Sequence, residues 1–425
     1  MVNFLKFLSP GLHIKRWILL MMVGLVVASL GIAYLLVQVY RAQPFPEIAG
    51  LLTLQFIDRP LRGALFLLLG VGSMTIAFRK LNQTFQAAFT RRGRGSVIEE
   101  IYSHRARERG PKIVVIGGGT GLSVALRGLK EFTSHLTAIV TVADDGGSSG
   151  RLRRDLGVLP PGDFRNCLVA LADVEPLMEM LFQYRFNAGS PDLDGHSFGN
   201  LFIVAMSEVT GDFERALREA SRVLAVRGQV LPSTLENVTL CAELGEAGMV
   251  QGESKVSQSR VPIERVFLQP KNPAAYPEAV KAIHEADMVV VGPGSLFTSV
   301  LPNLLVRGVA DALINSNAIK VYVCNVATQP GETDGFRISD HLDALLRHLP
   351  VEENLFDYVV VNDHLGLPMP STGKVEPVSP NPEADLDGRL VLADVVDETN
   401  AVRHDSNKLA LVLLRLYEKQ AALVA

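Results

Sequence analysis

The segment KIVVIGGGTG, residues 112–121, decides the fold expected for most of this chain. Residues 113–116 are β-branched and apolar on both faces, which is typical of a strand buried inside a parallel sheet. Glycines occupy positions 117–119, and a helical pattern runs from residue 122 to 132. Glycines let the backbone turn sharply and approach a ligand closely, and the first N–H groups of a helix have no partner within it. Strand, glycine turn and helix start together predict a phosphate-binding loop.

The glycine loop lacks part of each common phosphate-binding motif. Gly117, Gly119 and Leu122 occupy the G-x-G-x-x-G frame, so its last glycine is missing, and the Lys-Ser/Thr pair of the P-loop is missing too. A plain turn stays open as an alternative, and the incomplete motif disfavours an NAD-dependent oxidoreductase. If the loop holds phosphate, a valine at Gly118 is expected to abolish binding, because it would fill the space of the phosphate and resist a positive φ.

A second strand ends in acidic residues one βαβ unit later. The segment AIVTVADDGGSSG, residues 138–150, reads as a strand over 139–142 followed by Asp144 and Asp145. Carboxylates at such a strand end accept hydrogen bonds from sugar hydroxyls, or hold Mg²⁺ against phosphates. Both aspartates are therefore candidate catalytic residues, and Asp145 is the candidate metal ligand, with Mg²⁺ as the candidate cofactor. A solvated acidic turn is the alternative.

Two later strands also end in small polar residues. The strand at 288–291 leads into GPGSLFTS, which contains Gly294 and Ser295, and the strand at 321–324 leads to Thr328. Because parallel strands share one carboxyl edge, we expect these loops to meet the first two in one crevice. Four such loops are hard to explain as unrelated turns.

Two segments between the second and third of these loops are candidate parts of the site. PPGDFRN, residues 160–166, carries Arg165, which could clamp a phosphate or pair with a neighbouring aspartate instead. GHSFGN, residues 195–200, carries His196, a candidate acid, base or phosphate donor. Structural capping of the following helix remains open for His196, and Ser197 and Asn200 are alternative capping residues.

The composition limits the classes of protein to which this chain can belong. The chain has 425 residues, which is more than one soluble core usually takes, and its net charge of −4 gives no indication of nucleic-acid binding. Its three cysteines are far apart and form no C-x-x-C pair. This favours a reducing compartment and argues against a disulfide framework or a cysteine-ligated zinc.

The first eighty residues predict a membrane hairpin. Residues 17–40 carry no charge and are long enough to span a bilayer, and a shorter apolar run follows, with a second helix expected at about 61–78. A cleaved signal peptide is the alternative, but its apolar part would be shorter. Basic residues at both outer ends place the termini in the cytoplasm. The expected location is therefore the cell membrane, multi-pass, with the remaining domain cytoplasmic.

The rest of the chain divides into a linker and a domain. Residues 81–110 are arginine-rich and read as a juxtamembrane linker, either on anionic head groups or simply solvated. From residue 111 to 425, strand and helix patterns alternate, which predicts an α/β domain with a mainly parallel sheet. Within it, residues 155–226 are mostly helical in pattern, and residues 237–251 read as a hairpin.

Seven sequence blocks in order resemble the CofD/YvcK family, and the YvcK branch most closely. They are GGGTG, ADDGGSSGRLR, PPGDFRNCLVALAD, HSFGNL, GQVLPST, PGSLFTSVLPNLLV and CNVATQPGETDGF. The resemblance covers residue 112 to about 407 and leaves out the N-terminal hairpin. It implies a Rossmann-like three-layer fold with a helical insertion, and a nucleotide or nucleotide-sugar ligand across the sheet edge.

Two functions come with this resemblance. CofD enzymes transfer a phospholactyl group from a guanylated donor to a deazaflavin acceptor with Mg²⁺, whereas YvcK proteins are gluconeogenesis factors that affect cell shape and bind UDP-sugars. The blocks PPGDFRNC and GGSSG follow the YvcK pattern. The expected function is therefore a membrane-tethered gluconeogenesis factor that binds a UDP-sugar and regulates envelope metabolism. A phospholactyl transferase is the alternative, and the sequence leaves open whether any reaction is catalysed. A homo-oligomer is expected, and nucleic acid is not an expected partner.

The expected roles divide among the motifs. The glycine loops hold phosphates, Asp144 and Asp145 hold hydroxyls or Mg²⁺, Arg165 balances charge, and His196 orients the ligand. The expected ligand-binding residues are Gly117, Gly118, Gly119, Thr120, Gly121, Gly147, Ser148, Arg165, Asn166, Asn200, Gly294, Ser295 and Thr328.

Overall fold

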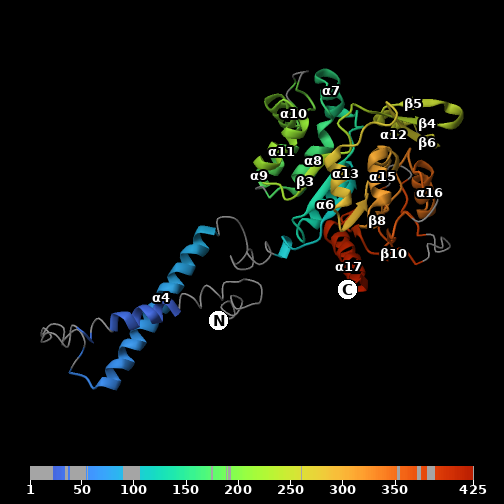
Figure 1. Ribbon diagram of the computed structural model, residues 1–425. Coiled ribbons are helices and arrows are strands. Elements are labelled where there is room, and N and C mark those ends of the chain that lie inside the picture. The colour runs from blue at the N-terminus through green and yellow to red at the C-terminus, as the bar shows by residue number, and fades with distance from the viewer. Residues whose placement is uncertain are drawn as a thin grey trace. The chain divides into compact units, whose positions relative to one another are not determined.

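The chain forms two units, which are described separately. The computed structural model describes residues 23–33, 37–38, 54, 56–89, 106–173, 176–187, 189, 193–259, 261–351, 355–370, 375–380 and 388–424. The units are Met1–Ala106, drawn in blue where it is described, and Arg107–Ala425, drawn from cyan to red (Figure 1). All the motifs singled out above, apart from the apolar spans and the linker, lie in the second unit.

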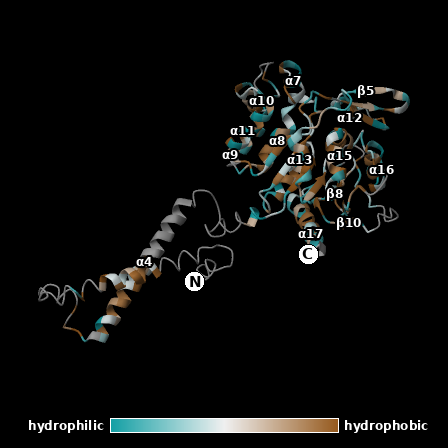
Figure 2. Ribbon diagram, viewed as in Figure 1, coloured by the Kyte–Doolittle hydropathy of each residue, from teal (hydrophilic) through white to brown (hydrophobic). Residues whose placement is uncertain are grey.

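Helices with exposed apolar side chains make up most of the described part of the first unit. They are Val23–Ala33 and α4 (Arg59–Phe89). Leu25 and Leu67 are 58% and 69% exposed, and Figure 2 shows apolar residues in brown on both helices. Within the described ranges, no single helix combines the length and hydropathy of a membrane span. The expected span 17–40 lies partly outside those ranges, and the expected span 61–78 falls within α4.

A parallel sheet forms the centre of the second unit. Its strands are β1 (Ile113–Gly117), β2 (Leu136–Val140), β3 (Gln229–Pro232), β7 (Met288–Val291), β8 (Ile319–Val323), β9 (Tyr358–Asn362) and β10 (Leu390–Ala393). Their order is β10-β9-β8-β7-β1-β2-β3, and all neighbours are parallel. β1 lies near the middle and every one of its residues is buried, as its β-branched run predicts. The expected Rossmann-like α/β class is confirmed.

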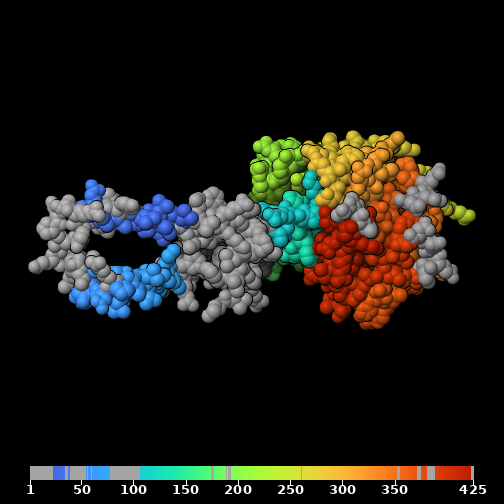
Figure 3. All heavy atoms as spheres, turned by 60° about the horizontal axis from the view of Figure 1, so that its bottom comes forward, coloured from blue at the N-terminus to red at the C-terminus, as the bar shows by residue number. Residues whose placement is uncertain are grey.

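The helices of this unit either contact the sheet or pack against other helices and the smaller strands. They are α6 (Gly119–Leu129), α7 (Gly147–Leu156), α8 (Pro161–Leu171), α9 (Pro176–Gln183), α10 (Phe198–Thr210), α11 (Phe213–Val223), α12 (Glu253–Gln258), α13 (Pro277–His284), α14 (Leu301–Leu304), α15 (Arg307–Asn315), α16 (Ile338–His348) and α17 (Ser406–Val424). The chain runs from β1 to β2 in one direction and from β7 to β8 in the other. Because parallel crossovers are right-handed, α6 and α15 cover opposite faces. Figure 3 shows α17 in red beside the teal segment that contains α6, against which it packs.

Smaller antiparallel elements complete the unit. They are β4 (Thr239–Glu243), β5 (Met249–Gln251), β6 (Arg265–Gln269), β11 (Val396–Asp397), β12 (Asn400–His404), the short helix η2 (Gly245–Ala247) and the π-helical turn η3 (Leu296–Val300). β4 and β5 pair antiparallel across η2, which confirms the hairpin predicted at 237–251. The predicted helical region at 155–226 contains α8 to α11.

Several element boundaries differ from the expected ones, those of α6 and β2 among them. α6 begins at Gly119 and not at residue 122, because the glycines themselves form its first turn. β2 ends at Val140 and not at residue 142. There the Thr141 hydroxyl oxygen accepts a hydrogen bond from the Ala143 N–H at 3.3 Å, and such local bonds compete with the strand ladder.

Candidate functional site

The carboxyl edge of the sheet opens into a cavity where the strand order reverses. β1 and β7 are neighbours, but the chain leaves them toward opposite faces, so a crevice forms beyond their ends. This carboxyl-edge cavity measures about 590 Å³. Its lining includes residues 118–121, 293–295, 325–330 and 402–404, and Glu253. The loops after β1, β7 and β8 therefore meet as the sequence predicts.

The expected site residues fall into two groups. The loop after β2 contributes none of the cavity's lining residues. Lining the cavity are Gly118, Gly119, Thr120, Gly121, Gly294, Ser295 and Thr328. Outside the lining are Gly117, Asp144, Asp145, Gly147, Ser148, Arg165, Asn166, His196 and Asn200.

The glycine loop is shaped by close contacts with its neighbours. Gly119 has φ +61, a left-handed conformation, whereas Gly118 is extended with φ −167. A Cβ on Gly118 would lie 2.7 Å from Asp163 Oδ2, and a Cβ on Gly121 would lie 2.5 Å from the carbonyl oxygen of Pro293. The positive φ expected at Gly118 is therefore wrong, and a side chain there would meet Asp163. That the side chain would also fill the space of a phosphate stays a prediction.

Two amides fix the loops that follow β7 and β8. Asn325 accepts a hydrogen bond from Gly294 N at 3.1 Å and donates one to Gly294 O at 2.9 Å. Gln329 Nε2 donates to the Ser295 hydroxyl at 2.6 Å. Thr328 is committed elsewhere, since its backbone N–H donates to Glu376 O at 2.8 Å and its hydroxyl oxygen accepts from Glu376 N at 3.0 Å. Asn325 and Gln329 therefore hold the cavity wall in place.

A cationic residue from the C-terminal part of the chain lines the cavity. Arg403 on β12 is the one permanent cation among the described lining residues. His404 follows it and is buried, with Nε2 3.1 Å from the carbonyl oxygen of Cys324. Burial lowers the pKa of His404 to about 4, so its ring is neutral at physiological pH. Sequence reasoning missed both residues, because β12 follows β1 by almost three hundred positions and carries no glycine motif.

Two partly buried carboxyl groups lie near the glycine loop. Asp163 on α8 accepts a hydrogen bond from the Gly119 N–H, and burial together with Asp144 raises its pKa to about 7. Glu253, the first residue of α12, lines the cavity. Burial and four neighbouring carboxylates raise its pKa to about 9. Neither residue belongs to the expected site: Asp163 lies in the PPGDFRN motif, where only Arg165 and Asn166 are expected to bind ligand, and no motif marks Glu253.

The two aspartates after β2 have structural partners. Asp144 Oδ1 accepts a hydrogen bond from Gly146 N at 2.8 Å and so closes the acidic turn. Asp145 Oδ1 accepts from Ser254 N at 2.9 Å and also from the Ser254 hydroxyl, so it caps the start of α12. Over the described ranges, no three His, Cys, Asp or Glu side chains gather in a way that could hold a metal ion. In this structure the Asp145 carboxylate is occupied by Ser254.

His196 belongs to a buried cluster that joins α7 to α10. The Ser148 hydroxyl lies 2.9 Å from His196 Nδ1 and accepts a hydrogen bond from Asn200 Nδ2 at 3.0 Å. All three side chains are buried, and burial is the main cause that lowers the pKa of His196. None of the three lines the carboxyl-edge cavity. In this structure, the cluster ties two helix starts together.

Arg165 is buried beside the same cluster. Its Nη1 donates to the Ser197 hydroxyl at 2.6 Å and its Nη2 donates to Asn166 Oδ1 at 2.9 Å. The Ser197 hydroxyl also accepts from Asn200 N at 3.3 Å, so Ser197 caps α10, as one of the alternatives predicted. The charge of Arg165 still acts on Asp163 and Asp144. Arg165 therefore balances buried acids from outside the cavity.

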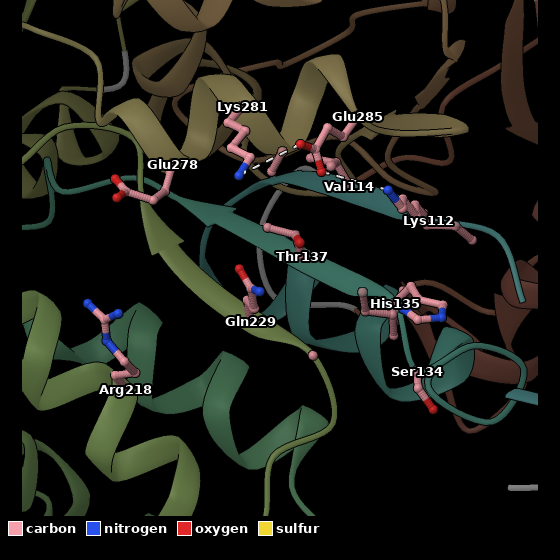
Figure 4. Close-up of a pocket in the computed structure, with 14 residues that line it drawn as sticks. Lys112, Val114, Ser134, His135, Thr137, Arg218, Gln229, Glu278, Lys281 and Glu285 are labelled. Atoms are coloured by element: carbon pink, nitrogen blue, oxygen red, sulfur yellow. Dashed lines mark ion pairs between the residues drawn. The ribbon is translucent and has the colours of Figure 1, made fainter. Parts of the chain in front are cut away.

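A second hollow of the same size lies at the opposite edge of the sheet. This amino-edge hollow also measures about 590 Å³ and is lined by the starts of β1, β2 and β3 together with residues of α11 and α13. Figure 4 shows Glu285 joined to both Lys112 and Lys281, with distances of 3.7 and 3.8 Å. The two lysines thus share one glutamate, and no glycine turn after a strand is among the described lining residues.

The carboxyl-edge cavity has the donors that a diphosphate needs. Thr120 and Gly121 lie in the first turn of α6, where backbone N–H groups have no acceptor within the helix. The positive end of the helix dipole lies behind them. Arg403 adds a cation that can bind phosphate oxygens in bidentate fashion. The arrangement suits an anionic ligand with further polar groups.

Comparison with known proteins gives the family. A family model described as 2-phospho-L-lactate transferase CofD matches residues 113–385. The gluconeogenesis factor of Bacillus subtilis is 48% identical over 317 residues, covering 73% of this chain and 99% of that protein. A relative from Nostoc sp. is also 48% identical and covers 97% of this chain and 92% of its own length; it bears a provisional form of the same name.

A solved structure agrees with these matches. The crystal structure of a upf0052 family member from Bacillus halodurans aligns with a TM-score of 0.67 and 48% identity, covering 72% of this chain and 99% of that one. Sequence and structure therefore point to the same relatives. The chain belongs to the CofD family, on the side of it that contains the bacterial gluconeogenesis factors.

Proposed function

We propose that this protein is a gluconeogenesis factor that binds a UDP-sugar in the carboxyl-edge cavity and regulates envelope metabolism. The single observation that carries the proposal is the pairing of the α6 N-terminus with Arg403 across one cavity at the strand-order reversal. Backbone N–H groups and a guanidinium are the donors that nucleotide diphosphates require. The uridine base and the sugar rest on the family resemblance.

Binding without chemistry is favoured over phospholactyl transfer. A transferase must neutralise charge on the transferring phosphoryl group, usually with Mg²⁺ and a positioned acid or base. Asp145 instead caps α12, and His196 is held by Ser148 outside the cavity. A regulator needs only a difference in affinity between two conformations. The cavity meets that smaller requirement.

Thermal unfolding with added ligand tests this proposal. UDP-hexoses and UDP-N-acetylhexosamines should raise the Tm of the purified protein without Mg²⁺, because a ligand that binds only the folded state stabilises it. Arg403→Ala should weaken binding by roughly 1–3 kcal/mol, the usual cost of losing a charged hydrogen bond. Arg347→Ala is the matched control, since this arginine is exposed on α16 away from the cavity.

Other nucleotides provide the contradicting outcome. Stabilisation by guanine nucleotides but not by uridine nucleotides would favour the transferase. So would product formation from a guanylated phospholactate donor and a deazaflavin acceptor. Equal UDP-sugar affinity in the Arg403→Ala and Arg347→Ala proteins would show that the ligand does not bind in the carboxyl-edge cavity.

We also propose that the first unit tethers the protein to the cytoplasmic side of the cell membrane. Its support is the exposed apolar surface of Val23–Ala33 and α4. The Bacillus subtilis relative matches only 73% of this chain, whereas the Nostoc relative matches 97%, so the first unit is shared by some relatives only. The full chain should sediment with membranes after a high-salt wash. Recovery in the soluble fraction, or a reporter at Ala425 that is accessible from outside the cell, would contradict the tether.

A further inference from the structure

Glu253 lines the carboxyl-edge cavity, and its carboxyl group has no hydrogen-bond partner among the described residues. It is the first residue of α12, after a turn at Gly252 with φ +103, and it lines the same cavity as the glycine loop. Across the described part of the chain, its carboxyl group makes no hydrogen bond and no ion pair. It is the one carboxyl group among the described lining residues.

The charged groups around Glu253 are nearly all acidic. Asp144 and Asp145 from the loop after β2, Asp163 from α8 and Glu332 from the loop after β8 all act on it. η3 and β5, which pack against α12, carry no charged residue, and Glu243 on β4 is exposed. On α12 itself, Lys255 is exposed. The surroundings therefore oppose a further negative charge.

Two arginines act on the neighbouring carboxylates but form no ion pair with Glu253 among the described residues. Arg153 acts on Asp144 and Asp145, and its guanidinium donates to Asn237 Oδ1, at 2.8 Å from Nε, and to the backbone oxygen of Asp144 at 3.3 Å. Arg165 acts on Asp163 but donates to Ser197 and Asn166. Arg403 lines the cavity and is available to the ligand. The charged groups that act on Glu253 are carboxylates, and Arg403 is not among them.

A bound anionic ligand would further disfavour a negative charge on Glu253. An ionised Glu253 would repel a phosphate held by the α6 N-terminus, whereas a protonated carboxyl group carries an O–H that can donate to it. The surroundings already favour the protonated form, because burial and nearby carboxylates both disfavour the charge.

We propose that Glu253 binds the anionic part of the ligand in its uncharged form, as a hydrogen-bond donor, and so selects anionic ligands. This role of Glu253 rests on the proposed function, and it explains how the cavity accommodates a carboxyl group beside a diphosphate. A carboxylate that accepts from a sugar hydroxyl would need the opposite protonation state. The two assignments can therefore be separated by substitution.

The first experiment needs no ligand. Unfolding of the full chain and of Glu253→Gln is followed from pH 4.5 to pH 9. A carboxyl group whose pKa is raised on folding stabilises less and less as pH rises above its unfolded value of about 4.3. Glu253→Gln should therefore have the higher Tm at pH 8, by about 3 °C or more, and the gap should close toward pH 4.5. Glu246→Gln, an exposed control on η2, should show no such trend.

The second experiment uses UDP-glucose and UDP-N-acetylglucosamine as probes between pH 7 and pH 10. Glutamine keeps a donor at the same place, so Glu253→Gln should bind within about threefold of the unaltered protein at pH 7. Affinity of the unaltered protein should fall toward tenfold per pH unit above about pH 9, and the variant should lose that fall. Glu253→Ala, which lacks the donor, should bind at least about tenfold more weakly at pH 7.

The outcomes separate the two proposals. A Tm gap that does not grow with pH, or a tenfold loss of affinity in Glu253→Gln at pH 7, would overturn the uncharged donor while leaving UDP-sugar binding intact. If no UDP-sugar binds to the unaltered protein, the proposed function fails. The ligand-free experiment then still decides whether Glu253 is protonated.

Discussion

The two hollows at opposite edges of the sheet have the same volume but different chemistry. Each measures about 590 Å³. At the carboxyl edge, glycine turns bring helix starts and backbone N–H groups to the surface of the cavity. At the amino edge, Glu285 pairs with both Lys112 and Lys281 (Figure 4). Volume therefore does not identify the site, whereas unsatisfied donors at the strand-order reversal do.

The largest effect should come from adding a side chain between the two glycine loops. In Gly121→Val, the new Cβ would lie 2.5 Å from the Pro293 carbonyl oxygen, so the loops must separate. We expect a loss of about 1–3 kcal/mol in the free energy of unfolding, as for overpacked sites, and loss of UDP-sugar binding. Gly366→Val is the matched control, because nothing lies within 4 Å of a Cβ there. Chemical denaturation compares them, and equal stability would show that the loops are not in contact.

A smaller effect should follow from releasing the β7 loop. Asn325→Ala removes both hydrogen bonds to Gly294 and leaves backbone groups of a partly buried loop unpaired. We expect a loss of about 1–3 kcal/mol, divided between stability and UDP-sugar affinity. Asn315→Ala, which loses one exposed bond to Asp311 O, is the control. Urea unfolding measures the loss of stability, and calorimetric titration measures the loss of UDP-sugar affinity. If Asn325→Ala lost no more stability and no more affinity than Asn315→Ala, Asn325 would not be part of the site.

Asp163 should give the carboxyl edge a pH dependence of stability. Its pKa is raised from 3.8 to about 7, so its protonated form is favoured in the folded state and its contribution declines as pH rises from about 4 to 7. Asp163→Asn keeps an acceptor for the Gly119 N–H and should flatten that part of the Tm curve. The test is the difference between the two curves, and parallel curves from pH 4 to 8 would refute the shift.

The smallest effect is expected at the amino edge. Lys281→Ala breaks an exposed pair with Glu285 on α13, and such pairs contribute about 0.3–0.5 kcal/mol. Thermal unfolding should change by about 1 °C, and UDP-sugar affinity should stay the same. A clear loss of affinity in this variant would make the amino-edge hollow part of the binding site.

The sheet and its loops could be predicted because their signals are local. A β-branched run that ends in glycine indicates a buried strand from the local sequence alone, as it does for β1. Because parallel strands share one carboxyl edge, residues 118–121 then lie beside Gly294 and Ser295. The order of the strands was not needed for that step. The family blocks added the ligand class but not the geometry.

The remaining site residues could not be predicted, because distant segments provide them. Arg403 comes from β12 and Glu253 from the start of α12, and neither lies in a motif. Conversely, His196 and Asn200 lie in a polar motif but turn toward Ser148 in the interior. A short polar block does not reveal whether its side chains face a cavity or another helix start, since both uses favour the same residues.

Hydrogen exchange with and without a UDP-sugar tests the central claim most directly. The ligand should slow amide exchange at residues 118–121, 294–295 and 402–404, which line the carboxyl-edge cavity. Exchange at residues 134–137 and 278–285, around the amino-edge hollow, should not change. Protection of the amino-edge segments alone would contradict the account, because it would place the ligand where the charges of the protein are already paired.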